Sequence, residues 1–521
     1  MTNAAAGAAQ AVPGAAPAHR GMIVVSIMLA TIMQALDTTI ANVALPHMQG
    51  SLSATQEQIS WVLTSYIVAA AIMTPPTGFL AARFGRKRLF LFAVAGFTLA
   101  SLLCGLAQTL PQMVAFRLLQ GVFGAALVPL SQAVLLDTYP REQHGSAMAL
   151  WGVGVMVGPI LGPTLGGYLT EYYDWRWVFL INLPFGLMAF FGILGFVPET
   201  KRDAGRGFDF FGFAMLSLGI GALQLMLDRG EVQGWFGSTE IILEACLAGL
   251  GIYLFLVQML TAERPFLEPR LFKDRNLVVG LLFIFVIGII LLATLALMPP
   301  FLQGLMGYPV ITTGMVLAPR GIGTMIAMIV VGRIVGRVDA RVLIFAGLAL
   351  TALSLWEMAE FTTDVSQWAI IRTGVVQGLG LGLIFVPLSA LTFATLAPEL
   401  RTEATGLFSL MRNLGSSIGV SIVTALLSQF TQINHAQIGE HISPFNPMMA
   451  PSLLPPFLDP STPQGIAALN AMVTQQAATI AYLNDFRLMM YVVLAALPML
   501  LLLRRPVRAT AAPAAAVAVA D

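Results

Sequence analysis

Fourteen apolar stretches, each long enough to cross a lipid bilayer as a helix, constrain the fold of this 521-residue chain more than any other feature. Hydrophobic residues make up 57% of the chain and charged residues 10%, whereas a soluble domain carries about 25% charged residues. A segment inside a bilayer must satisfy its backbone hydrogen bonds internally, which favours helices. The sequence therefore predicts an all-α, multi-pass membrane protein. The spans are predicted near residues 21–45, 58–80, 89–107, 111–136, 146–168, 176–197, 210–228, 240–260, 277–301, 311–332, 341–357, 366–391, 404–427 and 488–504.

The distribution of basic residues predicts which ends of the spans face the cytoplasm. Of the 27 Lys and Arg residues, twenty lie in alternate connections and the two chain ends, three lie in the remaining connections, and four lie inside spans. Connections rich in Lys and Arg are retained in the cytoplasm. Both termini are therefore predicted to be cytoplasmic, as an even number of spans also requires.

The chain resembles itself across its middle, which predicts two related halves. Residues 78–87 align with residues 332–341, and Gln120-Gly followed by Val-Pro-Leu-Ser recurs at Gln377-Gly. Parallel repeats of this kind build transporters that rock two bundles around a midplane cavity. We therefore expect a six-helix bundle over 21–197, two additional spans over 210–260, and a second six-helix bundle over 277–504.

Three further segments complete the predicted organisation. Residues 1–20 and 505–521 are rich in Ala and Pro, which predicts a disordered N-terminus and a cytoplasmic tail. Residues 427–487 form the one long region predicted to be external. This region is either a solvated loop with a surface helix over 465–483, or a docking surface for an external partner.

Residues 151–168 combine four regularly spaced glycines with two prolines. The glycines recur every four residues and so share one helical face, which allows another backbone to approach closely. Each proline removes a backbone donor and bends the helix. We expect this face to form the packing seam between the two halves. The residues concerned are Gly154, Gly158, Gly162, Gly166, Pro159 and Pro163.

Asp37 is the predicted proton-carrying residue. Gln34, Asp37, Thr38 and Asn42 follow helical spacing and form the polar stripe of an otherwise apolar span. A lipid-facing carboxylate costs several kcal/mol, so the stripe should face a cavity. A carboxyl group poised between desolvation and a nearby cation can bind and release a proton. The alternative is a static stripe that only packs helices.

Arg117 is the predicted counter-charge of Asp37. From the 1.5 Å rise per residue, Asp37 lies at about 12 Å and Arg117 at about 9 Å from the external ends of their spans. We expect contact directly or through Gln120, unless Arg117 only binds backbone carbonyls. Arg320 and Arg412 lie about 14 Å inside their spans on the same rise, and either attract acidic substrates or bind carbonyls. Gln34, Thr38, Asn42, Gln120 and Arg412 are the predicted cavity residues.

Several kinds of chemistry are excluded by the sequence. No Gly-Lys pair exists, so no phosphate-binding Walker loop can form, and transport energy must come from an ion gradient or a partner ATPase. The five histidines show no metal-ligand spacing, and no nucleophile elbow is present. We expect no enzyme activity, cofactor, metal or nucleic-acid partner.

These segments resemble the major facilitator superfamily, and more narrowly its fourteen-span drug:proton antiporters of the EmrB/QacA type. The resemblance runs from about residue 21 to 505 and rests on motifs that occur in the family's order. They lie at residues 36–46, 78–88, 117–121, 152–167 and 175–184, with pieces at 227–230, 434–437 and 446–447 that are similar to the EmrB subgroup.

The resemblance implies a gate in the loop between spans two and three. Its residues here are Gly78, Arg83, Gly85 and Arg86. The family usually places an Asp after the Leu-Ala pair, where this chain has Ala82, which puts the usual carboxylate lock in doubt. Asp137 at the end of span four is expected to pair with Arg83 or Arg86 instead.

The resemblance also implies a function. It predicts a proton-coupled exporter of hydrophobic or amphipathic toxic compounds in a bacterial inner membrane, powered by the proton gradient. The EmrB subgroup works with a periplasmic membrane-fusion adaptor and a TolC-type outer-membrane channel, which are the expected partners beside lipid and small hydrophobic drugs. Alternatives are an exporter of one narrow class, such as fatty or aromatic acids, and a symporter for a specific metabolite.

Overall fold

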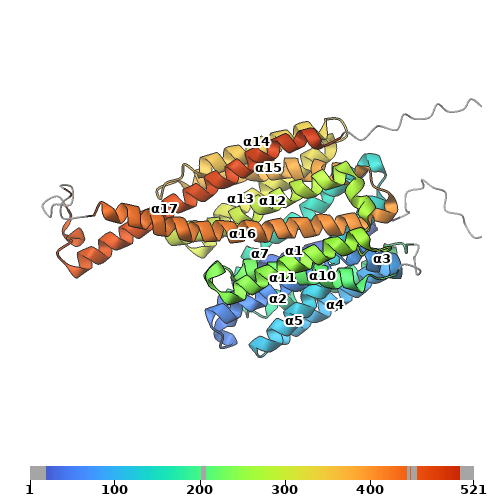
Figure 1. Cartoon of the computed structure of the whole chain (residues 1–521), viewed down its shortest axis with the longest axis horizontal. Coiled ribbons are helices and arrows are strands. Elements are labelled where there is room, and N and C mark those ends of the chain that lie inside the picture. Colours follow the sequence, from blue (N-terminus) through green and yellow to red (C-terminus); the bar gives the residue numbers. More distant parts are fainter. Residues whose placement is uncertain (1–18, 201–206, 443–445, 447–453, 505–521) are drawn as a thin grey trace, which may run out of the picture.

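The computed structural model describes residues 19–200, 207–442, 446 and 454–504. Within these ranges the chain is built of helices (Figure 1). Thirteen of them are long and apolar enough to cross a membrane, and α2 with α3 makes a fourteenth span that is bent by 57°. The predicted fourteen-span, all-α architecture is confirmed. Most of the predicted N-terminal segment and the predicted tail at 505–521 lie outside the described residues.

The N-terminal half contains six spans, three of them broken into two helices. The half is built from α1 (Arg20–Ser51), α2 (Gln56–Met73), α3 (Thr77–Phe84), α4 (Arg86–Leu106), α5 (Leu110–Gly124), α6 (Leu127–Thr138), α7 (His144–Tyr172), α8 (Trp177–Leu180) and α9 (Asn182–Phe196).

The two additional spans and the C-terminal half follow. The additional pair is α10 (Phe210–Arg229) and α11 (Thr239–Thr261). The C-terminal half is built from α12 (Arg275–Pro300), α13 (Val310–Ile334), α14 (Ala340–Met358), α15 (Gln367–Ala394), α16 (Arg401–Glu440) and α17 (Pro463–Ala496).

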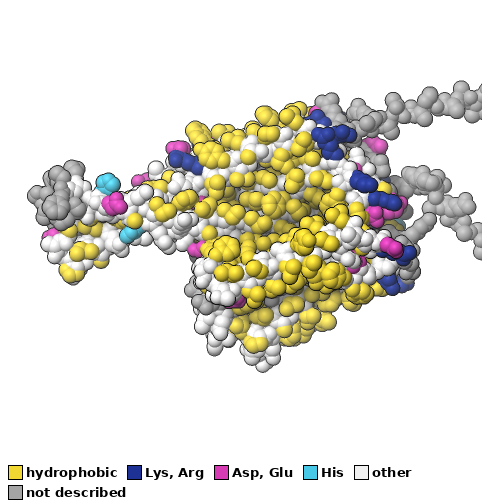
Figure 2. Space-filling model, in the orientation of Figure 1, with side chains coloured by type: hydrophobic (Ala, Val, Ile, Leu, Met, Phe, Trp, Pro, Cys, Tyr) yellow, Lys and Arg dark blue, Asp and Glu magenta, His cyan; other side chains and the backbone are white. Residues whose placement is uncertain are grey.

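The last two helices differ from the prediction. α16 continues to Glu440, and α17 begins at Pro463, so much of the predicted loop over 427–487 is helical. In Figure 1 both helices project beyond the other spans. In Figure 2, Lys and Arg side chains gather mainly at the opposite end of the molecule.

The glycine face of α7 packs against α1 of its own half. A Cβ added to Gly158 would lie 2.9 Å from the Ala35 Cβ, and one added to Gly166 would lie 2.9 Å from the Ile40 Cγ1. The remaining pairs on this face are Gly154 with Met28 and Gly162 with Thr39. The prediction that these glycines form the seam between the halves is wrong, because the seam uses the other side of α7.

The seam between the halves joins α7 to α13. A Cβ added to Gly152 would lie 2.6 Å from the Met328 sulfur, and one added to Gly332 would lie 2.6 Å from the Ala149 Cβ. Small residues on both helices therefore allow close approach. α7 remains helical through Pro159, which reaches the central cavity, and Pro163, which is exposed on the bundle surface.

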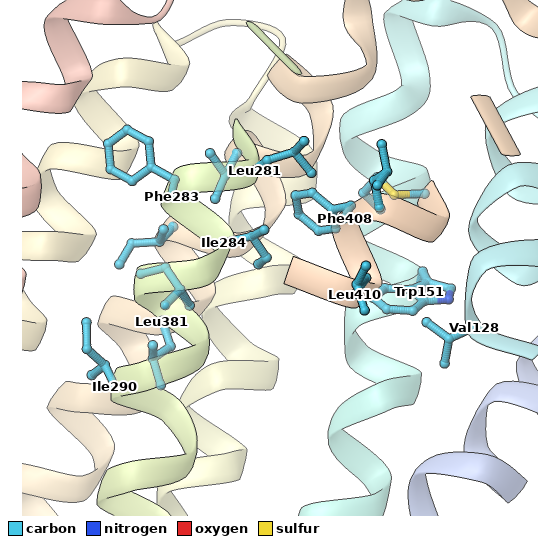
Figure 3. Close-up of a cluster of buried hydrophobic side chains, with 14 of the residues drawn as sticks. Val128, Trp151, Leu281, Phe283, Ile284, Ile290, Leu381, Phe408 and Leu410 are labelled. Atoms are coloured by element: carbon cyan, nitrogen blue, oxygen red, sulfur yellow. The ribbon is translucent and has the colours of Figure 1, made fainter. Parts of the chain in front are cut away.

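One apolar cluster extends from one half to the other next to this seam. Figure 3 shows Leu410 of α16 beside Trp151 of α7 and Val128 of α6. The Trp151 ring also stacks on Phe385 of α15 at 5.8 Å between centroids, and its Nε1–H donates to Ser131. The halves therefore share a packed apolar core.

Candidate functional site

A cavity of about 360 Å³ lies between the two halves. It is lined by α1, α2, α5, α6 and α7 on one side and by α12, α13, α15 and α16 on the other, with one residue from α10. Most of the lining is apolar, and among the described residues that line it there is no Asp, Glu or Lys. The predicted residues that do line it are Gln34, Thr38, Asn42, Arg117 and Arg412.

Asp37 is fully buried behind this lining and accepts three hydrogen bonds. The Arg117 Nη1 donates to its Oδ2 at 2.8 Å, and the Gln120 Nε2 donates to its Oδ1 at 2.8 Å. The Asn182 Nδ2 also donates to Oδ1, at 2.9 Å. Arg117 thus contacts Asp37 directly, and the Gln120 side-chain amide also links the two residues. Gln120 lies behind the cavity wall rather than in it.

Arg117 is held by more than its ion pair. Its Nε donates to the Val62 backbone oxygen at 3.0 Å, and its Nη1 donates to the Gln120 Oε1 at 2.7 Å. The guanidinium also lies 4.4 Å from the centroid of the Tyr66 ring, a favourable cation–π distance. Both functions considered for Arg117 are therefore present, because it binds a carbonyl and pairs with Asp37.

Sequence reasoning missed two members of this network. Asn182 begins α9, and its amide bridges Asp37 to the Ser101 hydroxyl at 3.0 Å. Tyr66 of α2 lines the cavity beside Arg117, and the Gln34 amide donates to its hydroxyl at 3.2 Å. Asn182 could have been recognised from the sequence, because it is an isolated polar residue near the start of an apolar span.

Arg412 and Arg320 differ in their environments. Arg412 lines the cavity, and its side chain makes no hydrogen bond or ion pair with any residue in the described ranges. Arg320 is buried on α13, and its Nη2 donates to the Leu291 backbone oxygen at 3.2 Å. Arg320 therefore serves a packing role, whereas Arg412 presents a positive charge to the cavity.

The halves are joined at the basic end of the molecule by ion pairs centred on Asp137. Asp137 pairs with Arg86 of α4 in its own half, and with Arg401 of α16 at 2.7 Å in the other half. Arg401 also donates to the Leu136 backbone oxygen at 3.3 Å. Of the two pairings predicted for Asp137, the structure contains the one with Arg86, and Arg401 was not anticipated.

Two glycines shape this end of the molecule. A Cβ added to Gly78 of α3 would lie 2.8 Å from the Glu403 Cα, so only glycine lets α3 approach α16 this closely. Gly85 separates α3 from α4 with φ of +90°, a conformation that side chains disfavour. Arg83 lies in the last turn of α3 beside them. The predicted gate residues thus surround the contact between the halves.

A central cavity between two bundles that share a helix order, with the ion pair of Asp137 and Arg401 joining the bundles at one end, defines a membrane transporter rather than an enzyme. The chain belongs to the Major Facilitator Superfamily, whose family model matches residues 27–420. This membership agrees with the resemblance seen in the sequence motifs.

Two relatives and one solved structure place the chain further. It is 38% identical to the multidrug export protein EmrB of Escherichia coli over 82% of this chain and 84% of that protein. It is 37% identical to the fatty acid resistance protein FarB of Neisseria gonorrhoeae over 81% of this chain and 84% of that protein. The human organic anion transporter MFSD10 has the same fold, with a TM-score of 0.59 over 91% of this chain and 99% of that one at 15% identity.

Proposed function

We propose that this multidrug efflux transporter is driven by protons that bind and leave Asp37. The observation that carries the proposal is the buried Asp37–Arg117 pair, 2.8 Å apart, in which Arg117 lines the cavity and Asp37 lies behind it. A carboxylate inside a membrane domain is costly, and such residues mark ion pathways. The relatives named as multidrug export proteins support export as the direction of transport.

The hydrogen bonds suit the ionised form of Asp37. All three neighbours donate to the carboxylate, and a protonated carboxyl group would instead need an acceptor for its own proton. The Asn182 Oδ1 is buried without a hydrogen-bond partner in the described residues, so rotation of that amide would supply the acceptor. Protonation would also release Arg117 to Gln120 and the Val62 carbonyl, which it already contacts.

Alternating access follows from the contact at the basic end. In this conformation Asp137 and Arg401 hold the halves together there, so the cavity is closed on that side. Opening that side requires the pair to separate and the halves to rock about the α7–α13 seam. We propose that Asp37 protonation favours this step and that substrate binding favours the return.

Efflux of a fluorescent drug from cells or right-side-out vesicles, with an imposed proton gradient, tests the proposal. We expect efflux to stop when the gradient is collapsed, and Asp37→Asn to abolish the gradient-driven component. Continued gradient-driven efflux by Asp37→Asn would disprove the role of Asp37. Efflux that survives collapse of the gradient would disprove proton coupling itself.

A narrower substrate class, amphipathic acids, is a second candidate that Arg412 favours. The one other charged side chain lining the cavity in the described residues is Arg117, whose charge is compensated by Asp37. Arg412 therefore leaves the cavity positive. A carboxylate with an apolar body would pair with it, and the relative named for fatty acid resistance is consistent with such a substrate.

Arg412→Gln distinguishes the two candidates. The acid-exporter function predicts a selective rise of KM for anionic substrates, with little change for neutral or cationic drugs. An equal effect on every substrate would instead assign Arg412 to the cavity's structure. Arg320→Gln serves as the comparison, because Arg320 binds a carbonyl and does not line this cavity.

We also propose the location and the partners of the protein. The basic end would face the cytoplasm of a bacterial inner membrane, with both termini on that side. The projecting parts of α16 and α17 would then lie in the periplasm, as the docking surface for a membrane-fusion adaptor that leads to a TolC-type outer-membrane channel. Site-specific crosslinking from this projection tests the proposal, and capture of no periplasmic partner would contradict it.

A further inference from the structure

The additional helix α10 lies between the two halves, where it contacts α2 on one side and α16 on the other (Figure 1). Its partner α11 packs behind it through a close glycine contact. A Cβ added to Gly251 would lie 2.8 Å from the Gly219 Cα. The inserted pair is therefore part of the bundle interface rather than a peripheral addition.

Contacts along the whole of α10 tie it to the N-terminal half. At one end the Phe208 ring, just before α10, packs 4.7 Å from the Phe79 ring of α3. In the middle a Cβ added to Gly221 would meet Ile72 of α2 at 3.2 Å. At the other end, the Arg229 guanidinium lies 5.3 Å from the Trp61 ring of α2.

Two adjacent residues at the end of α10 bond to opposite halves. The Thr64 hydroxyl of α2 donates to the Asp228 carboxylate. The Ser421 hydroxyl of α16 donates to the Leu227 backbone oxygen. The halves rock relative to each other during transport. At least one of these two hydrogen bonds must therefore break during the cycle. The greater number of contacts with α2 and α3 indicates that the bond to α16 is the one that breaks.

Gln224 connects α10 to the cavity. Its side chain is 4% exposed and lines the cavity, between residues contributed by α2 and α16. It makes no hydrogen bond to any residue in the described part of the chain. An amide in a membrane helix that faces a cavity without a partner offers both a donor and an acceptor to a bound molecule.

We propose that α10 forms part of the cavity wall, moves with the N-terminal half and slides along α16. In this proposal Gln224 is a specificity-determining residue that forms a hydrogen bond with the substrate. The substrates concerned carry a carbonyl, amide or hydroxyl group within an apolar body. The proposal rests on the transport function proposed above and adds the inserted helix to its binding site.

Substitution tests the role of Gln224. Gln224→Leu should raise KM by about fivefold, the value of one lost hydrogen bond, for substrates with hydrogen-bonding groups, and leave KM for purely apolar dyes and kcat unchanged. Ser217→Ala is the matched control, since Ser217 lies two turns away on the same face of α10 and does not line the cavity. An equal change for every substrate, or no change, would overturn the assignment.

Crosslinking tests the movement of α10. Thr64→Cys with Asp228→Cys, or Leu227→Cys with Ser421→Cys, would be joined by a short reducible linker in a background of Cys104→Ser and Cys246→Ser. The link between α10 and α2 should leave efflux intact. The link between α10 and α16 should stop efflux until it is reduced. Tolerance of both links, or inhibition by the first, would overturn the proposal.

These outcomes are separable from failure of the proton mechanism. If Asp37→Asn retains gradient-driven efflux, the proton site is wrong, but the selectivity of Gln224→Leu and the crosslinking result still stand or fall by themselves.

Discussion

The two halves of the molecule repeat their packing but not their polar chemistry. In the N-terminal half, the glycines of α7 receive the backbone of α1. In the C-terminal half, Gly415 and Gly419 of α16 receive α12, with an added Cβ at Gly419 only 2.6 Å from the Ile289 Cα. The fifth span of each half therefore packs on the first span in the same way.

The polar sites at matching positions are different. In the N-terminal half the Gln120 amide donates to the Asp37 carboxylate, whereas in the C-terminal half the Gln377 amide donates to the Thr294 hydroxyl at 3.3 Å. Arg117 is buried against Asp37. Arg372, which precedes the second copy of the Gln-Gly motif, is half-exposed and pairs with Glu357 at 3.2 Å.

The comparison shows that the two halves share the helix packing of a duplicated fold, whereas the proposed proton site occurs in one half. The glycine contacts keep each bundle rigid, so both copies retain them. At these matching positions, only the N-terminal half has a carboxylate, and the Asp37 carboxylate accepts three hydrogen bonds. The C-terminal half contributes Arg401 to the closed end and Arg412 to the cavity instead.

The largest expected effect separates the two carboxyl groups that are fully buried in the described residues, Asp37 and Asp485. Asp37→Asn should reduce proton-driven efflux to the level of cells without the transporter, because no group remains there to carry the proton. Asp485→Asn is the matched control, since Asp485 is also fully buried but its oxygens have no hydrogen-bond partner among the described residues. Loss of efflux in both variants would contradict a proton site in one half only.

The next largest effect concerns the arginines. Arg117→Ala leaves Asp37 buried without its counter-charge and should destabilise the protein by about 3–5 kcal/mol. Arg372→Ala breaks a half-exposed ion pair and should cost about 0–1 kcal/mol. Thermal unfolding in detergent measures both. Equal shifts in Tm would mean that the two arginines are equivalent after all.

The packing comparison predicts similar effects in the two halves. Gly158→Ala and Gly419→Ala should each destabilise by about 1–3 kcal/mol through overpacking. Gly167→Ala, on the same helix as Gly158, meets nothing within 4 Å and should be neutral or slightly stabilising. If only one of the first two variants lost stability, the shared packing would not be the reason that the glycines occur in both halves.

The smallest effect is expected at the closed end. Asp137→Asn weakens the ion pairs with Arg86 and Arg401. It should shift the equilibrium by about 1–2 kcal/mol, roughly tenfold, towards the conformation in which the basic end of the cavity is open. Labelling of a cysteine placed on the cavity side of α16 near that end measures the shift. Unchanged labelling would show that Gly78 and its neighbours close this end without the ion pairs.

Much of the fold could be predicted from the sequence because the signals are local. A spanning helix is recognised from its own residues, so the fourteen spans followed from hydropathy, and the internal repeat indicated which pair is additional. The contact of Asp37 with Arg117 also followed, because a rigid helix converts position along the chain into depth. The length of α16 and α17 was underestimated, since helices that leave the membrane lose the apolar signal but not the backbone hydrogen bonds.

The sequence by itself determined the membrane architecture, the internal repeat and the polar stripe of α1. Only the tertiary structure decided that the glycines of α7 face α1, that Asn182 and Tyr66 complete the site, and that Gln224 reaches the cavity. The physical reason is that apolar and small residues cover several faces of each spanning helix. Which face meets which neighbour depends on all the bundle's helices at once, and no single segment contains that information.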